Sequence, residues 1–172
     1  CIAHKGFAWI EVETTGRAAH GSRYAEGVDA VVHMGRVLQG LERLEREVFP
    51  RHPHPLVGRP SVHASRIEGG IGLSTYPDRC RLEIERRTLP AETPEDVAAE
   101  MDALLAALRA ADPAFQASWR MTLFRPGLEV PAEAPIVRAV QRAAEEVLGR
   151  PVELTGEYAW LGFGATLPDY RR

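Results

Sequence analysis

Residues 79–88 form the segment of this sequence that most restricts its fold. Within the segment Cys80, Leu82 and Ile84 alternate with charged residues. Successive side chains of a β-strand point to opposite faces of the sheet, so the segment predicts a strand with one buried and one solvated face. Residues 7–15 alternate in the same way. Two such strands favour a sheet that helices cover on one side only.

Helical patterns lie between the predicted strands. A long helix is predicted over residues 25–48, ended by the proline-rich residues 49–55. Its apolar stripe is expected to consist of Val28, Val31, Gly35, Leu38, Leu41 and Val48. A second helix is predicted to begin after Thr93, because a threonine followed by Pro94 and two acidic residues is typical of a helix N-terminus. Asp112 and Pro113 end it.

Two more strands, at residues 61–68 and 117–125, complete the order strand, helix, strand, strand, helix, strand. In the last strand Trp119, Met121 and Leu123 are expected on one face. This order predicts an α+β fold, a ferredoxin-like βαββαβ two-layer sandwich with a four-stranded antiparallel sheet. It accounts for residues 7–125.

The residues outside this unit are predicted to belong to a second structural unit. Residues 126–172 hold a third predicted helix at 134–148 and a short predicted strand at 152–154. Residues 1–6 precede the first long strand. We therefore expect three parts, at residues 1–6, 7–125 and 126–172.

Composition excludes some classes of partner. A net charge of −3 gives no reason to expect nucleic acid, and no apolar run approaches the length needed to span a bilayer. The two cysteines, Cys1 and Cys80, have neither metal-ligand nor disulfide spacing. A cytoplasmic protein is the simplest expectation.

Several segments carry a more specific signal through their order and spacing. They are His4-Lys5-Gly6, Gly16 to Ser22, Glu26 to Ala30, Gly69-Gly70 with Tyr76 to Cys80, and Glu85 to Thr93. Together they resemble the inserted domain of the zinc-dependent hydrolase family that includes acetylornithine deacetylase, succinyl-diaminopimelate desuccinylase, aminoacylase and bacterial glutamate carboxypeptidase. The resemblance covers roughly residues 1–160.

The resemblance implies a ferredoxin-like lid that mediates homodimerisation and closes over an active site with two zinc ions. The substrate would be an N-acyl amino acid or a peptide, and the flanking residues would be pieces of an α/β catalytic domain. This sequence has no His-x-Asp motif and no histidine after His63, and its one Glu-Glu pair, Glu145-Glu146, is predicted to be a solvated helix face. We therefore expect zinc in a longer parent protein, no metal in this chain, and no activity from the chain alone. The resemblance also implies that a stretch is missing between Trp160 and Leu161.

His20 is the strongest candidate for a catalytic residue. By the resemblance, the histidine of this glycine-rich loop enters the partner subunit's active site and donates a hydrogen bond to the developing oxyanion. The alternative is a surface histidine without a role.

Arg87 and Ser74 are the candidate substrate-binding residues. The resemblance implies that Arg87 binds a substrate carboxylate, for which a guanidinium is well suited; the alternative is a cross-strand ion pair. Alternation places Arg86 on the opposite face, which makes it the weaker candidate. Ser74 replaces the asparagine that family members use to contact substrate, and it is shorter.

The remaining candidates favour structural interpretations. His52 and His54 have no acidic residue or cysteine nearby in the sequence and are predicted to lie in a solvated loop. A different function also stays open, because a fold alone does not specify one. The chain could be a non-catalytic ferredoxin-like module that dimerises or binds a small ligand. A His-x-Asp motif and a Glu-Glu pair encoded upstream would favour the enzyme.

Overall fold

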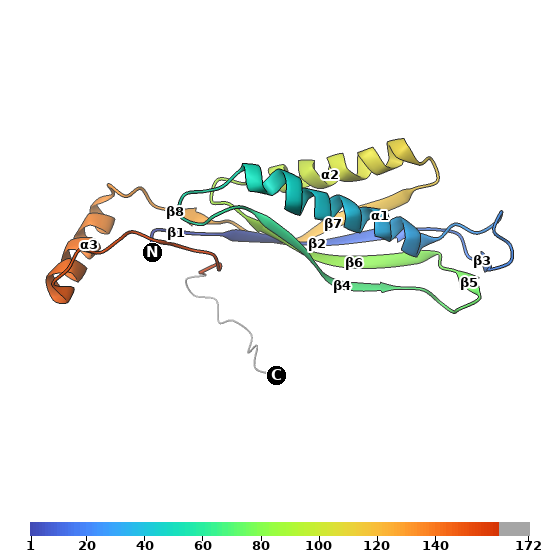
Figure 1. Cartoon of the computed structure of the whole chain (residues 1–172), viewed down its shortest axis with the longest axis horizontal. Coiled ribbons are helices and arrows are strands. Elements are labelled where there is room, and N and C mark those ends of the chain that lie inside the picture. Colours follow the sequence, from blue (N-terminus) through green and yellow to red (C-terminus); the bar gives the residue numbers. More distant parts are fainter. Residues whose placement is uncertain (162–172) are drawn as a thin grey trace.

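The computed structural model describes residues 1–161 and confirms the α+β, ferredoxin-like prediction. Its main sheet has four antiparallel strands in the order β4-β6-β2-β7. These strands are β2 (Gly6–Thr15), β4 (Ser61–Gly69), β6 (Arg79–Thr88) and β7 (Gln116–Arg125). Helices α1 (Ala30–Arg43) and α2 (Pro94–Ala111) lie on the same face of the sheet, and the other face is open (Figure 1).

The core lies between the sheet and the two helices. Cys80, Leu82 and Ile84 are buried there, as the alternation predicts. From α2, Val97, Met101 and Leu105 pack against the same cluster. Thr93 caps α2 by accepting a hydrogen bond from the Asp96 amide, which confirms the predicted start of this helix.

The predicted apolar stripe of the first helix is confirmed in part, because Leu41 is buried and Leu38 and Val48 pack against the core, but Val31 is exposed. Helix α1 begins five residues later than expected, with Asp29 as its N-cap, because Val28 forms an isolated bridge with Arg17 and so lies outside the helix. Its buried residues are Ala30, His33, Met34, Val37 and Leu41. The chain continues through a π-helix, Leu44–Val48, and a 3-10 turn, Phe49–Arg51.

The prediction for the last strand also needs one correction. A register shift lies opposite Trp9 and Ile10 of β2, so that Met121 pairs with Ile10 and Leu123 with Trp9. Ile10 is buried and Trp9 is exposed, which places Leu123 on the open face. Phe124 packs against the core instead.

A second, smaller unit follows the main sheet. It consists of β1 (Ala3–His4), β8 (Leu128–Glu129), β9 (Gly156–Glu157) and α3 (Pro135–Leu148). The strand predicted at residues 152–154 is wrong. The backbone of Val152 forms hydrogen bonds with side chains of α3 instead. Gln141 donates to its carbonyl, and Glu145 accepts from its amide. The expected boundaries of the three parts stay a prediction.

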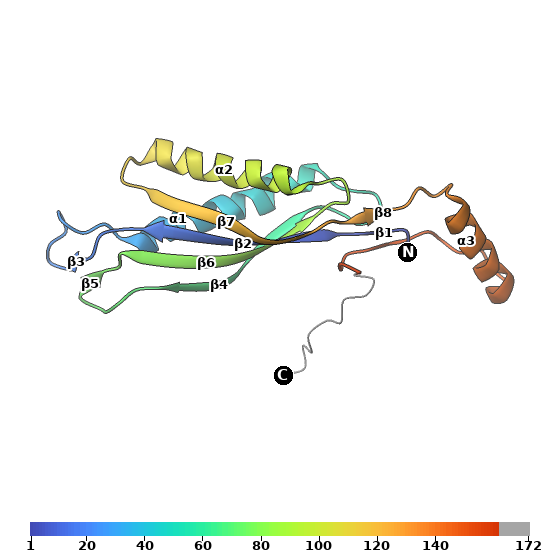
Figure 2. The ribbon, with the colours of Figure 1, turned by 180° about the vertical axis from the view of Figure 1, so that it is seen from behind.

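The two units meet where Gly6 lies against Arg125 and Gly127, a junction called the neck. A Cβ atom on Gly6 would lie 2.4 Å from the carbonyl oxygen of Arg125 and 2.5 Å from the amide nitrogen of Gly127. Position 6 therefore requires glycine, because a side chain would collide with the neighbouring backbone. The opposite end of the sheet carries a short antiparallel pair of strands, β3 (Ala19–His20) with β5 (Thr75–Tyr76), so the β3–β5 pair and α3 mark the two ends of the molecule (Figure 2).

None of the helices within residues 1–161 is both long and apolar enough to cross a membrane.

Candidate functional site

His20 is the last residue of strand β3, at the end of the molecule farthest from the neck, and it is exposed. Its ring nitrogen Nδ1 is 2.8 Å from the Ser22 hydroxyl and 3.3 Å from the Ser22 amide nitrogen, which donates to it. A backbone N–H can only donate, so Nδ1 accepts and the neutral ring carries its hydrogen on Nε2. Within residues 1–161 that Nε2–H has no acceptor. The ring therefore presents a free, oriented donor.

The contact between Ser22 and His20 does not form a catalytic triad. Such a triad needs a carboxylate that orients the base through its second nitrogen. No carboxylate of the described residues contacts His20, and the serine itself holds Nδ1. Ser22 acts here as an orienting group.

Ser74 lies beside His20. Its main-chain oxygen accepts a hydrogen bond from the Gly21 amide at 2.7 Å, and Thr75 pairs with His20 across the two short strands. Both side chains are exposed. The structure therefore brings together two of the three predicted site residues, from segments more than fifty positions apart in the chain.

Arg87 lies at the opposite end of the sheet, where it pairs with Phe7 next to the neck. Its side chain is 30% exposed on the open face, and its guanidinium lies 5.5 Å from the Phe7 ring centroid. Only Nε has a partner among the described residues, namely the Glu85 carboxylate at 2.7 Å. That contact runs along one strand instead of across two. Both terminal nitrogens remain free to bind a carboxylate.

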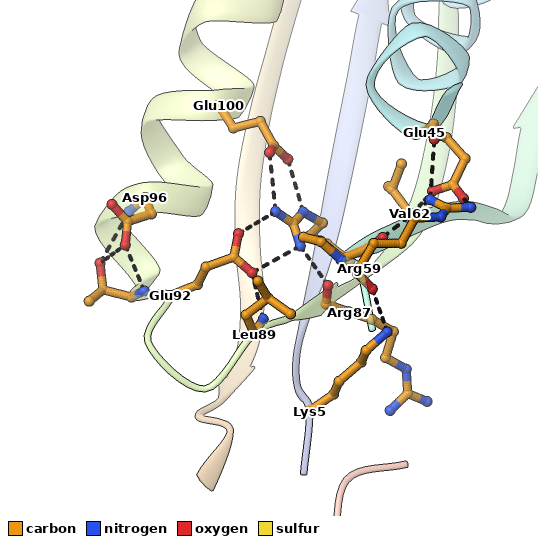
Figure 3. A network of polar contacts seen from close by, with 12 residues as sticks. Lys5, Glu45, Arg59, Val62, Arg87, Leu89, Glu92, Asp96 and Glu100 are labelled. Carbon is orange, nitrogen blue, oxygen red and sulfur yellow. Dashed lines mark hydrogen bonds and ion pairs between the residues drawn. The ribbon is translucent and has the colours of Figure 1, made fainter. Parts of the chain in front are cut away.

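Arg86 points into the interior, as the alternation predicts, and is fully engaged. It contacts Glu92 at 2.6 Å and Glu100 at 3.1 Å, and its guanidinium lies 4.2 Å from the Phe49 ring centroid. Figure 3 shows Glu92 and Glu100 converging on this network. Burial opposes the charge of Arg86, but the hydrogen bonds and attraction from Glu100 and Glu92 outweigh it and raise its pKa. Arg87 is therefore the arginine that is free for a ligand.

Sequence reasoning missed a second cation beside Arg87. Lys5 is 6% exposed; its ammonium group donates to the Arg59 carbonyl (Figure 3) and lies 5.2 Å from the Tyr158 ring centroid. Burial and the positive charges of Arg59 and Arg87 lower the pKa of Lys5. Its place in the His4-Lys5-Gly6 segment was the sequence signal for it.

No group of three or more side chains within residues 1–161 could hold a metal ion. The prediction that His54 lies in a solvated loop is wrong. His54 is half-buried, accepts at Nδ1 from the Leu56 and Val57 amides, and contacts the Glu129 carboxylate at 3.2 Å. Glu145 is likewise only partly solvated, because it accepts from Val152. The residues in hand therefore do not fit a zinc centre. The predicted discontinuity after Trp160 borders residues 162–172, which lie outside the described part.

A family model described as a peptidase dimerisation domain matches residues 2–113, more than half of the chain. Among curated proteins, the acetylornithine deacetylase of Myxococcus xanthus is 31% identical over 144 residues, which are 83% of this chain and 38% of that protein. The acetylornithine deacetylase of Edwardsiella ictaluri is 28% identical over 158 residues, 88% of this chain and 39% of that protein. The chain thus spans well under half the length of these relatives.

Solved structures share the fold. The aminopeptidase PepT of Bacillus cereus superposes with a TM-score of 0.70 and 20% identity, covering 92% of this chain and 40% of that one. A tripeptidase of Staphylococcus aureus gives a TM-score of 0.68 and 17% identity, covering 94% of this chain and 39% of that one. Together with the match over residues 2–113, these relationships identify the chain as a member of the peptidase dimerisation domain family of hydrolases.

Proposed function

We propose that this chain is the lid and dimerisation domain of a zinc-dependent hydrolase that cleaves amide bonds of N-acyl amino acids or peptides. Its relatives are deacetylases, and its structural neighbours include peptidases. This kinship favours the enzyme over a non-catalytic module for small ligands. The observation that carries the proposal is the position of the three site residues, with His20 and Ser74 at one end of the sheet and Arg87 at the other.

A single protomer cannot bring these two ends to one substrate. Arg87 pairs with Phe7, while Thr15, eight positions along β2, lies where the chain leaves the sheet toward His20. At about 3.3 Å per residue the two ends are roughly 25 Å apart. An arginine and a histidine side chain placed end to end do not span that distance. The two groups can act together only across two protomers.

Two-fold pairing of the sheet edges supplies such an arrangement. Strand β4 lies at an edge and runs from Ser61, opposite Arg87, to Gly69, opposite Cys80. Two copies of β4 related by a two-fold axis are antiparallel, so the Gly69 end of one lies near the Ser61 end of the other. This pairing would place the β3–β5 end, with His20 and Ser74, near the partner's Arg87.

Exposed apolar side chains favour the β4 edge over the β7 edge. Ile67 of β4 is 55% exposed, although its side chain lies on the face that the helices cover. Helix α1, which contacts β4, exposes Val31 and Val32. The exposed residues of β7 are all polar, namely Gln116, Ser118, Arg120, Thr122 and Arg125. The β4 edge therefore exposes a large apolar side chain and the β7 edge does not, which favours β4 as the interface.

Each residue then has a defined role. The Nε2–H of His20 would donate to the carbonyl oxygen that gains negative charge as the amide is attacked. The free nitrogens of Arg87 would bind the substrate carboxylate in a two-point contact. Ser74 would offer its hydroxyl next to His20.

The zinc requirement belongs to this proposal and would be met by residues beyond those described. A cytoplasmic location and the absence of nucleic-acid and membrane partners stay predictions from composition. Hydrolysis of N-acetyl-L-ornithine, other N-acyl amino acids and dipeptides by the zinc-supplemented full-length protein tests the function. A protein that hydrolyses none of these substrates would contradict the proposed function.

Replacing Ile67 with aspartate is expected to weaken the dimer at least tenfold, about 1.4 kcal/mol, because a charge would enter an apolar interface. Sedimentation velocity over a concentration series of the 172-residue chain measures the dissociation constant. Ala103→Asp is the matched control, since Ala103 is exposed on α2 near the other edge and the change alters net charge by the same amount. Equal dissociation constants for the two variants, or a wild-type monomer at all concentrations, would argue against the β4 interface.

A further inference from the structure

The tip of the molecule formed by the β3–β5 pair and its adjoining loops carries His20 and Ser74, and it also exposes large apolar side chains. Leu73 is 109% exposed, Tyr24 is 81% exposed and Ile71 is 65% exposed. Leu73 has the highest exposure of the large apolar residues within residues 1–161. Side chains so exposed in one protomer indicate a surface that another group covers.

The backbone fixes Leu73 next to the polar site residues. The Thr75 amide donates to the Gly72 carbonyl at 3.3 Å, so Leu73 and Ser74 are the two central residues of a β-turn. Gly70 precedes this turn with φ of +98°, in the left-handed region. The bond from the Gly21 amide to the Ser74 carbonyl, 2.7 Å long, ties the turn to the loop of His20. Any partner that meets His20 and Ser74 therefore meets Leu73 as well.

The second loop of the tip contributes Tyr24 in the same way. The Arg23 amide donates to the His20 carbonyl at 2.7 Å, and the Glu26 amide donates to the Arg23 carbonyl at 2.9 Å. These bonds form consecutive turns and place Tyr24 shortly after His20. The tip thus presents a polar pair together with apolar side chains from both loops.

We propose that Leu73, with Ile71 and Tyr24 of the same tip, forms an apolar acyl-binding surface that selects longer aliphatic N-acyl groups over acetyl. The inference rests on the proposed function, in which the tip enters the partner's active site. Arg87, at the other end of the sheet, takes the carboxylate of the amino acid. The tip is therefore left for the part of the substrate on the opposite side of the scissile amide, which is the acyl group.

The test compares N-acetyl-, N-butanoyl- and N-hexanoyl-L-ornithine as substrates of the zinc-supplemented full-length protein. Leu73→Ser is expected to lower kcat/KM for the hexanoyl substrate about tenfold, since even one lost methylene contact changes discrimination by a factor of about ten or more. The acetyl substrate should change less than twofold. Ala103→Ser, on the exposed face of α2, is the control and should alter neither value. The high exposure of Leu73 makes loss of folding from its replacement unexpected.

The outcomes separate this inference from the proposed function. If Leu73→Ser leaves the ratio of hexanoyl to acetyl hydrolysis unchanged while His20→Ala lowers both rates, the acyl surface is wrong and the shared site stands. If Leu73→Ser lowers all three rates equally, the residue serves dimerisation or folding instead of selection. A wild-type protein that hydrolyses none of the three substrates would overturn the inference, and inactivity toward every other N-acyl amino acid and dipeptide would remove the proposed function with it.

Discussion

Replacing His20 with alanine is expected to lower the kcat of the full-length hydrolase about 100- to 1000-fold, the usual effect of removing one oxyanion donor. KM should change little, because the contact strengthens only as charge develops on the carbonyl oxygen. The stability of the chain should stay near that of the wild type, since the His20 side chain is exposed and, within residues 1–161, forms hydrogen bonds only with Ser22. Steady-state kinetics with an N-acyl amino acid measures the change.

Ser22→Ala provides a graded comparison for this prediction. It removes the hydroxyl that lies 2.8 Å from Nδ1 but leaves the backbone amide that also donates to this nitrogen. The imidazole keeps its donor but loses part of its orientation, so we expect a loss well below that of His20→Ala. A His20→Ala enzyme with wild-type kcat would remove the histidine from the mechanism.

Replacing Arg86 with methionine is expected to lower the free energy of unfolding by about 3–5 kcal/mol. The guanidinium is 2% exposed and pairs with Glu92 and Glu100, so its loss leaves two carboxylates without their partner in a largely buried place. Glu92 also accepts from the Leu89 amide, which links the network to the turn before α2. Urea denaturation of the chain measures the effect.

The adjacent Arg87→Met is the matched control for Arg86. Arg87 is 30% exposed and has one ion pair, with Glu85, so its loss should cost less than about 1 kcal/mol. The triple change Arg86→Met, Glu92→Gln, Glu100→Gln should recover part of the stability lost in the single variant. Equal stability of the two single arginine variants would show that the buried network is not a main support of the fold.

The sequence predicted the main sheet well because two of its strands alternate cleanly. Each apolar residue of β6 lies where a period of two places it, and the same period separates Arg86 from Arg87. Local chemistry also located the start of α2, through the Thr93 cap. The errors arose from long-range effects. Because Arg17 and Val28 form a bridge, α1 begins later than the pattern predicts. A register shift in β7 places Leu123 on the open face of the sheet instead of the core face.

The site could be predicted only as separate residues. Nothing local indicates that Ser74 lies beside His20, because the hydrogen bond from Gly21 to Ser74 joins two distant segments. The separation of Arg87 from this pair depends on strand register, which the alternation does not specify. The burial of Lys5 and the contact of His54 with Glu129 depend on the meeting of the two units at the neck.

The central claim is that His20 of one protomer and Arg87 of its partner serve the same substrate. Mixing two inactive full-length variants, His20→Ala and Arg87→Met, tests it by subunit exchange. In a mixed dimer, one site receives the intact His20 of the second variant and the intact Arg87 of the first. The other site lacks both groups.

Random exchange of equal amounts makes about half of the dimers mixed, so about one quarter of the wild-type activity should return. Hydrolysis of an N-acyl amino acid, followed while the two proteins exchange subunits, is the measurement. Recovery toward that level is the predicted result. If both residues acted within one protomer, every site in the mixture would lack one of them, and persistent inactivity after verified exchange would contradict the shared site.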